Sequence, residues 1–240
     1  MFSLDDQKVI VIGASSGIGL AIARSVVAVG GQVVLASRST GELETLAHEM
    51  GARATAVTTD ITDELSLKSL FANTGHFDHL VITARSSPAT APFAEMDTVI
   101  VSDLVATKFM GAFHATRQAL PLLRPDGSIT FLSGVAAWKP AVGYSVLGAM
   151  NGALPAFARG LALEIAPIRV NVISPGIIDT PYWNKLSVEQ RHEFFAETAR
   201  QLPVRRVGQP QDVAQAAIYL MCSSFTTGTT LHVDGGGQLV

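Results

Sequence analysis

Residues 9–19 read Val-Ile-Val-Ile-Gly-Ala-Ser-Ser-Gly-Ile-Gly, an apolar run that breaks into a turn with three glycines. Apolar residues then recur at helical spacing (Ile18, Ile22, Val26, Val29), so the stretch predicts a strand, a sharp turn and a helix over 18–29. Such glycines let a backbone approach a pyrophosphate, which would rest on the free N–H groups and positive end of the helix. An ordinary glycine loop is the alternative.

Short apolar runs and longer helical patterns alternate along the rest of the chain. Continuous Val/Ile/Leu runs are typical of strands buried on both faces of a parallel sheet. We expect strands at 9–12, 33–36, 54–58, 80–82, 128–132, 169–173 and 230–233, with helices near 18–29, 41–50, 63–73, 97–123, 144–165 and 210–221. This order predicts an α/β fold, a doubly wound parallel sheet of about seven strands with helices on both faces.

Composition narrows the class of protein. The 240 residues show no linker, so we expect one domain over 1–240, and a net charge of -3 without basic clusters argues against nucleic acid or an anionic membrane as partner. The lone Cys222 excludes an internal disulfide. We find no secretory signal and no apolar stretch approaching about 18 residues, the length of a membrane span, so we expect a cytoplasmic protein. The histidines lack metal-ligand spacing, and we predict no metal.

The end of the second expected strand bears on the type of dinucleotide. Here the sequence reads Ser37-Arg38-Ser39, with no acidic residue to bond a free ribose 2′-hydroxyl. An arginine at this place accommodates a 2′-phosphate. Arg38 as a solvated surface charge is the alternative. The sequence therefore favours NADP(H) over NAD(H).

The order of motifs from Gly13 onward resembles the short-chain dehydrogenase/reductase family, which implies a single-domain Rossmann fold. Residues 13–19 look like its phosphate turn, Asp60-Ile61 like its adenine contact, 169–180 like its nicotinamide segment, and 206–214 with 228–236 like its C-terminal signature. The resemblance implies cofactor contacts from Gly13, Ser15, Ser16, Gly17, Ile18, Gly19, Ser37, Arg38, Asp60, Ile61, Ala84, Pro175, Gly176, Ile178 and Thr180.

The same resemblance exposes departures from the family pattern. Asn-Asn-Ala-Gly becomes Ile-Thr-Ala-Arg at 82–85, which keeps only Ala84. Counted without a gap, the family's catalytic Asn, Ser, Tyr and Lys positions hold Lys108, Gly134, Leu147 and Asn151. The register that places Tyr144 in the Tyr position would shift the following helix by three residues, and the Lys would still be missing.

Tyr144 matches a second pattern. Divergent relatives, the enoyl-acyl-carrier-protein reductases, carry Tyr-x6-Lys, and Tyr144 begins a similar stretch that ends in Asn151. A tyrosine with a pKa near about 10 stays protonated at neutral pH, so Tyr144 could donate a proton in reduction and would be a poor base. Asn151 could bond ribose hydroxyls. Lys108 could send its ammonium into the space left by the lost lysine, or point to water or a subunit interface.

Weaker candidates are Ser133, which could orient a substrate oxygen or only cap local backbone, and Arg85, an anion clamp or a structural ion pair. Residues from about 180 to 205 form the family's substrate lid, or an amphipathic helix packed in the core. Residues 111–123 and 152–163 suggest a buried helix pair, hence a homodimer or homotetramer.

Two classes of function remain open at this stage. The first is an NADP(H)-dependent oxidoreductase that transfers hydride between nicotinamide and a carbonyl or activated double bond of a small molecule. The second is a catalytically inactive NADP(H)-binding sensor or scaffold.

Overall fold

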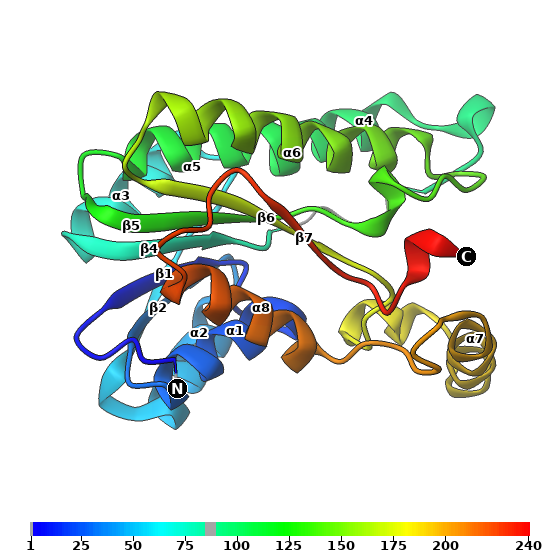
Figure 1. Ribbon diagram of the computed structural model, residues 1–240, viewed down its shortest axis with the longest axis horizontal. Helices are drawn as coiled ribbons and strands as arrows, with labels where there is room; N and C mark the ends of the chain where they lie inside the picture. Colours follow the sequence, from blue (N-terminus) through cyan, green and yellow to red (C-terminus); the bar gives the residue numbers. More distant parts are fainter. Residues whose placement is uncertain (1, 85–89) are drawn as a thin grey trace.

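The computed structural model describes residues 2–84 and 90–240. Its centre is one sheet of seven parallel strands in the order β3-β2-β1-β4-β5-β6-β7 (Figure 1). The strands are β1 (Lys8–Ile12), β2 (Gln32–Ser37), β3 (Ala54–Thr58), β4 (Phe77–Ile82), β5 (Leu123–Leu132), β6 (Arg169–Pro175) and β7 (Thr230–Val233). The predicted doubly wound parallel sheet is confirmed.

Helices connect the strands as right-handed crossovers require. They are α1 (Gly17–Ala28), α2 (Thr40–Met50), α3 (Glu64–Thr74), α4 (Thr98–Leu104), α5 (Gly111–Ala119), α6 (Ser145–Glu164), α7 (Val188–Gln201) and α8 (Pro210–Cys222). Five short 3-10 turns, η1 (Gly51–Arg53), η2 (Phe93–Glu95), η4 (Val135–Ala137), η5 (Pro181–Lys185) and η6 (Gly237–Leu239), and a π-helical segment, η3 (Val105–Met110), complete the elements of the described ranges.

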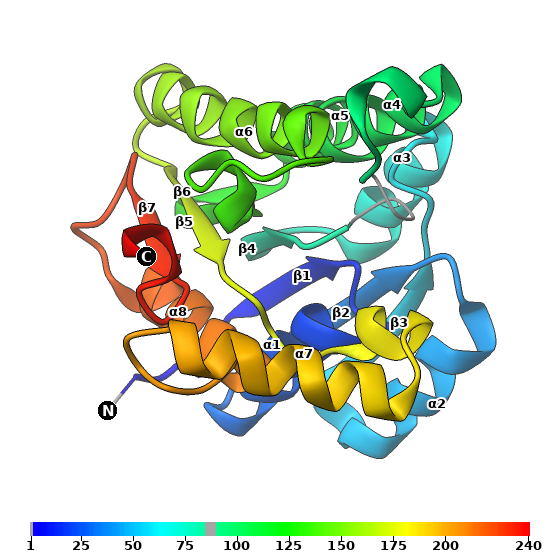
Figure 2. The same cartoon turned by 90° about the vertical axis from the view of Figure 1, so that its right-hand side faces the viewer.

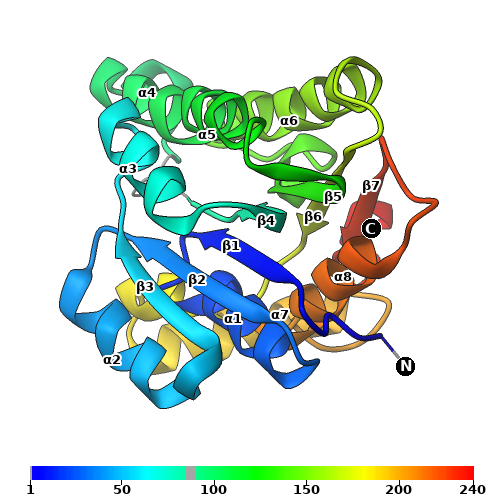
Figure 3. The ribbon, with the colours of Figure 1, turned by 90° about the vertical axis from the view of Figure 1, so that its left-hand side faces the viewer.

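Alternate residues of the strands face two separate cores. In β1, Val9 and Val11 belong to the cluster that α1, α2 and α8 cover, whereas Ile10 and Ile12 belong to the cluster under α3, α5 and α6. The two helical layers lie on opposite faces of the sheet (Figures 1 and 3). Burial on both faces explains why the strands read as continuous apolar runs.

The prediction of one long helix over 97–123 was wrong in two respects. It is divided into α4, η3 and α5, and it ends at Ala119, because Pro121 has no N–H with which to continue the helical ladder. Leu123 already belongs to β5 and pairs with Phe77. The π-helical segment carries Lys108, so the irregularity falls on a candidate site residue.

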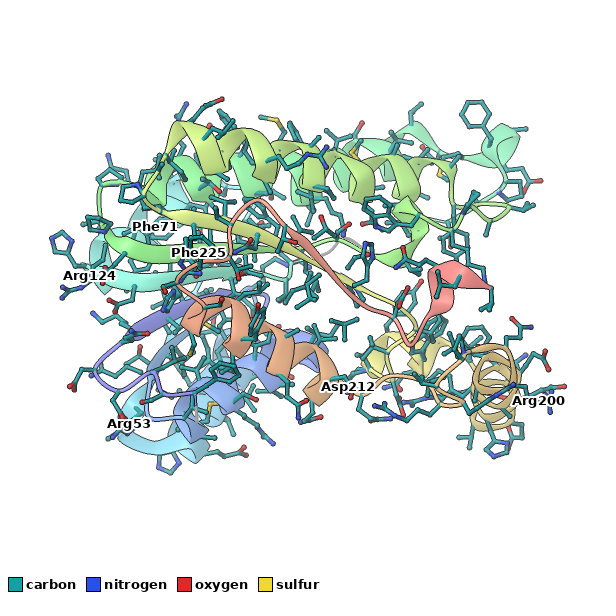
Figure 4. All side chains as sticks on the ribbon, viewed as in Figure 1. Arg53, Phe71, Arg124, Arg200, Asp212 and Phe225 are labelled. Atoms are coloured by element: carbon teal, nitrogen blue, oxygen red, sulfur yellow. The ribbon has the colours of Figure 1, made fainter. Side chains whose placement is uncertain are left out.

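The expected lid folds as η5 and α7. Because no residue of α7 is buried, a helix packed in the core is not what this segment forms. Helix α7 lies outside the two layers and runs past the N-terminal end of α1 (Figure 2). Arg200 extends from it away from the sheet (Figure 4).

Helix α6 contradicts the expectation that no stretch of the chain is apolar over the length of a membrane span. Its 20 residues are, by length and composition alone, long and apolar enough to cross a membrane, which the sequence interpretation had excluded for every stretch. The helix packs on the sheet through Leu154 and Ala158, and Asn151 is buried on the same side. Its apolar character therefore serves the core on one face and remains uncovered in this single chain on the other.

The strand order places the site. The chain runs from β1 through β2 to β3 on one side of β1 and then crosses to β4 on the other side, so the connections leaving β1 and β4 separate at their carboxyl ends. In open α/β sheets ligands bind in the crevice at such a switch point.

Candidate functional site

The turn after β1 is shaped by glycines that cannot be replaced. Gly13 has φ +95°, and a Cβ there would lie 2.6 Å from Thr83 Oγ1 and 2.8 Å from Ala84 N. A Cβ on Gly19 would collide with the carbonyl of Gly13 itself. The turn therefore lies flush against the end of β4, as a backbone that must approach a phosphate group requires.

Helix α1 begins at Gly17, at the end of this turn. Ser16 is its N-cap residue, but the serine side chain makes no capping hydrogen bond. The first N–H groups of any helix lack partners within the helix, and together with the helix dipole they attract an anion. Residues 16–19 thus present unused donors and a positive helix end to the space in front of the turn.

That space is a cleft of about 640 Å³. Most of the cofactor residues implied by the sequence line it together: Gly13, Ser15, Ser16, Gly17, Ile18, Gly19, Ser37, Arg38, Asp60, Ile61, Ala84 and Thr180. It is also lined by Thr59, Thr62, Thr83, Asp103, Thr107, Leu132, Pro181 and Tyr182, which the sequence interpretation did not assign to the cofactor. Pro175, Gly176 and Ile178 do not line it.

Arg38 stands exposed at the rim of the cleft, just beyond β2. Across the rim, the pKa of Asp60 is lowered, first by a hydrogen bond from the backbone of Thr62, against the opposing effect of burial, and also by the Thr62 hydroxyl and the charge of Arg38. The carboxylate of Asp60 is therefore ionised at neutral pH, and its charge interacts with that of Arg38 at the rim.

Thr83 replaces an asparagine of the family pattern, and its hydroxyl holds the phosphate turn in place. Its Oγ1 lies 3.0 Å from Ile12 O and 3.1 Å from Gly13 O, so one proton is shared between two carbonyls. The end of β4 is thereby tied to the end of β1. Arg85, two residues further on, lies outside the described residues.

Lys108 does not point away into solvent. Its ammonium lies 2.6 Å from Asn151 Oδ1, 3.2 Å from Leu132 O and 3.4 Å from Ser133 O. The side chain thus crosses from η3 to the carboxyl end of β5 and meets α6 there. Two residues 43 apart in the chain form one polar group beside Leu132, and Leu132 lines the cleft.

Ser133 is engaged by the backbone of α6. Its hydroxyl donates to Asn151 O at 2.8 Å, and the side chain is buried. That carbonyl would normally accept the N–H four residues later, but the residue there is Pro155, which has none. The geometry favours the capping interpretation of Ser133 over contact with a substrate.

Tyr144 is the N-cap residue of α6 and is partly buried. Burial raises the pKa of its phenol above the ordinary value of 10.0, and the neighbouring Tyr182 adds to the effect. The hydroxyl is therefore protonated across the neutral range, which suits a proton donor and not a base.

The segment after β6 is held in place by contacts with Asp234, Gly208 and Trp183. Gly176 lies against Asp234, where a Cβ would come within 2.8 Å of the Asp234 Cα, and Ile178 forms a parallel bridge with Gly208. The indole N–H of Trp183 donates to Ile178 O at 2.9 Å, and the Trp183 ring lies 4.6 Å from that of Phe194. Trp183 thus links this segment to α7.

Known proteins resemble this chain over nearly its whole length. A family model described as "Enoyl-(Acyl carrier protein) reductase" matches residues 13–238. The short-chain dehydrogenase/reductase ATR9 of Stachybotrys chlorohalonatus is 34% identical over 254 residues, which cover 100% of both chains. The chain belongs to the short-chain dehydrogenase/reductase family.

One further relative and one solved structure agree with this family assignment. The 3-oxoacyl-(acyl-carrier-protein) reductase of Bos taurus is 32% identical over 242 residues, 98% of this chain and 99% of the relative. The crystal structure of a small-chain dehydrogenase in complex with NADPH superposes with a TM-score of 0.83 at 30% identity, over 98% of this chain and 100% of the other. This short-chain dehydrogenase/reductase is thus an oxidoreductase of a family that uses a nicotinamide cofactor.

Within the family pattern, the altered positions of this chain lie together. Lys108 and Asn151 are in direct contact, and Gly134 lies against the Asn151 amide. The sequence interpretation missed the roles of Thr83, Pro155 and Trp183. Only Pro155 had a readable signal, because a proline in a helix leaves the carbonyl four residues earlier without its partner.

Within residues 2–84 and 90–240, no group of three or more His, Cys, Asp or Glu side chains converges in a way that could hold a metal ion.

Proposed function

We propose that this chain is an NADP(H)-dependent reductase that transfers hydride to a carbonyl or an activated double bond of a small molecule, with Tyr144 as proton donor. The observation that carries the proposal is a cleft lined by the glycine turn and by Arg38, with no acidic residue directly after β2. An arginine there pairs with a 2′-phosphate through charge-assisted hydrogen bonds.

The residues present fit such a cofactor. The glycine turn leaves no room for a Cβ, and the amino end of α1 offers N–H donors to a pyrophosphate. Pro175, Gly176 and Ile178 do not line the cleft, so the role proposed for them is to position the segment that carries Thr180, which does line it. When bound, the nicotinamide supplies or accepts the hydride.

Tyr144 completes the reaction in the reduction direction. As the substrate carbon accepts hydride, an electron pair moves to the substrate oxygen, and the Tyr144 hydroxyl gives that oxygen a proton. The raised pKa of Tyr144 keeps this proton in place at neutral pH but makes the residue a poor base for alcohol oxidation. The geometry therefore supports reduction as the working direction.

Lys108 supplies the positive charge that the family lysine would otherwise bring. Its contact with Asn151 places the ammonium on the side chain that replaces that lysine. We expect Lys108→Ala to lower turnover by about tenfold to a hundredfold, the scale of one charged hydrogen bond of about 1.5–3 kcal/mol. An unchanged rate, measured as NADPH oxidation, would remove Lys108 from the mechanism.

A second copy of the chain is the partner proposed for the outer face of α6. Ala149, Gly152 and Ala156 are exposed along it at helical spacing, and Leu163 is 84% exposed. Small residues allow another helix to approach closely, so a homodimer or homotetramer follows. Light scattering after gel filtration tests the assembly. The absence of nucleic-acid and membrane partners and a cytoplasmic location stay predictions.

The proposed activity is tested with a panel of ketones and enoyl thioesters, including ethyl acetoacetate and crotonyl-coenzyme A. NADPH oxidation by the wild-type protein on any of these compounds supports the proposal. The opposite result is NADPH binding, seen as a change of cofactor fluorescence, without oxidation on any compound. That result would favour the inactive sensor or scaffold.

A further inference from the structure

Asn151 occupies space that belongs to another position of the chain. A Cβ built on Gly134 would lie 2.8 Å from Asn151 Nδ2 and 3.5 Å from its Cγ. The amide nitrogen of Asn151 therefore sits where the side chain of residue 134 would begin. Gly134 is the residue that this asparagine requires, and the two positions have to be considered together.

The orientation of the Asn151 amide is fixed by chemistry. An ammonium only donates hydrogen bonds, so the atom 2.6 Å from Lys108 Nζ must be the oxygen Oδ1. The nitrogen Nδ2 consequently faces Gly134. A cation on the carbonyl oxygen polarises the amide and makes its N–H groups stronger donors.

Those N–H groups are available. Asn151 is 3% exposed, and Nδ2 has no hydrogen-bond acceptor within residues 2–84 and 90–240. It is also absent from the fully enclosed side-chain atoms without a partner in those ranges, so Nδ2 is not sealed off. Buried Asn171 differs, because its Nδ2 donates to Thr226 O at 2.9 Å and its Oδ1 accepts from Thr229 N.

Tyr144 and Asn151 share one face of α6. They are seven residues apart, two helical turns or roughly 10 Å along the axis. Gly148 lies between them on that face, and its position against Ala136 O shows that the face packs on the segment that follows β5. Tyr144 and Asn151 therefore border the same segment, about one turn of α6 on either side of Gly148.

We infer that Asn151 is a substrate-binding catalytic residue: its Nδ2–H group donates a hydrogen bond to the substrate oxygen that gains negative charge on reduction. Lys108 is then a positioning residue that orients and polarises the amide. No proton leaves Asn151; the substrate carbon gains hydride, the oxygen gains the electron pair, and the proton comes from Tyr144. This inference rests on the proposed reductase function and names the group that stabilises the charge.

The sharpest test is Asn151→Asp. The substitution keeps the shape and the contact with Lys108, so the fold should persist, but it removes both N–H donors. Loss of one preorganised donor lowers turnover by about a hundredfold to a thousandfold. We expect that loss in kcat on the best compound of the panel, with the KM and the NADPH dissociation constant changed less than about threefold.

Gly134→Ala tests the same atom from the other side, because the new Cβ displaces Nδ2. Its matched control is Gly41→Ala on α2, a helical position outside the cleft where a Cβ meets nothing within 4 Å. We expect kcat to fall at least about tenfold for the first variant and to remain unchanged for the second, with melting temperatures reported for both.

Three outcomes overturn the inference. If Asn151→Asp leaves kcat within threefold of the wild type, the amide does not act on the substrate. If NADPH binding weakens as much as kcat falls, Asn151 is a cofactor ligand. If the wild-type protein oxidises NADPH on no compound, the proposed function itself has failed, which is a result distinct from the other two.

Discussion

The two ends of the site differ in the kind of chemical group that makes their contacts. Around β1 and α1, the turn is made of backbone groups and of glycines with no room for a side chain, and it matches the family pattern, although Thr83 at the end of β4 does not. Around β5 and α6, contacts are made by the side chains of Lys108, Ser133 and Asn151, and here the pattern is changed at every catalytic position. Backbone geometry tolerates no substitution, whereas side chains that meet in space can be exchanged between positions.

The largest expected effect tests the backbone end. Gly13→Val places a branched side chain at φ +95° against Thr83 Oγ1 and Ala84 N. We expect NADPH affinity to fall more than about a hundredfold, since both the turn and the end of β4 must move.

Fluorescence titration with NADPH measures this effect. Gly41→Ala is the control, because Gly41 lies on α2 with nothing within 4 Å of an added Cβ. Tight NADPH binding by a folded Gly13→Val protein would contradict the idea that the glycine turn holds the phosphate.

The next effect tests the side-chain end. Tyr144→Phe removes the proposed proton donor but keeps the ring, and positioned general acids contribute about a hundredfold or more to the rate. We expect kcat to fall by that amount while NADPH affinity stays within twofold, measured by stopped-flow oxidation of NADPH. Equal rates in the two proteins would show that the proton comes from elsewhere.

A smaller effect is expected at the cleft rim. Arg38→Asp replaces the cation with an acid that repels a 2′-phosphate and bonds a free 2′-hydroxyl. The ratio of kcat/KM for NADPH to that for NADH should fall by about tenfold to a hundredfold, with kcat itself little changed. A ratio that does not move would mean that Arg38 is a solvated surface charge.

The smallest expected effect is a flat pH profile. An acid whose pKa is raised stays protonated below that pKa and loses its proton only as the pH rises through it. The reduction kcat should therefore stay level from pH 6 to about pH 9, because an ordinary tyrosine ionises only near about 10. A decline with a midpoint below pH 9 would show that a cation has lowered the pKa of Tyr144 instead.

The sequence predicted the backbone end of the site better than the side-chain end. Apolar runs and glycines report backbone needs locally, so the seven strands, the glycine turn and part of the cleft lining could be read in order. The contact between Lys108 and Asn151 could be put forward only as one of two alternatives. Its geometry depends on how η3 departs from a regular α-helix, and the sequence carries no local signal for a π-helical segment.

Pro155 affects the stage at which the conformational entropy of the Asn151 side chain is lost. Because it leaves Asn151 O without a helical partner, that carbonyl binds Ser133, while the side chain of the same residue binds Lys108. Asn151 is thereby anchored at both ends to neighbouring elements before any ligand arrives. The rotational entropy of its amide is lost during folding and not during each encounter with a ligand, so the protein offers a rigid donor where a lone asparagine would offer a mobile one.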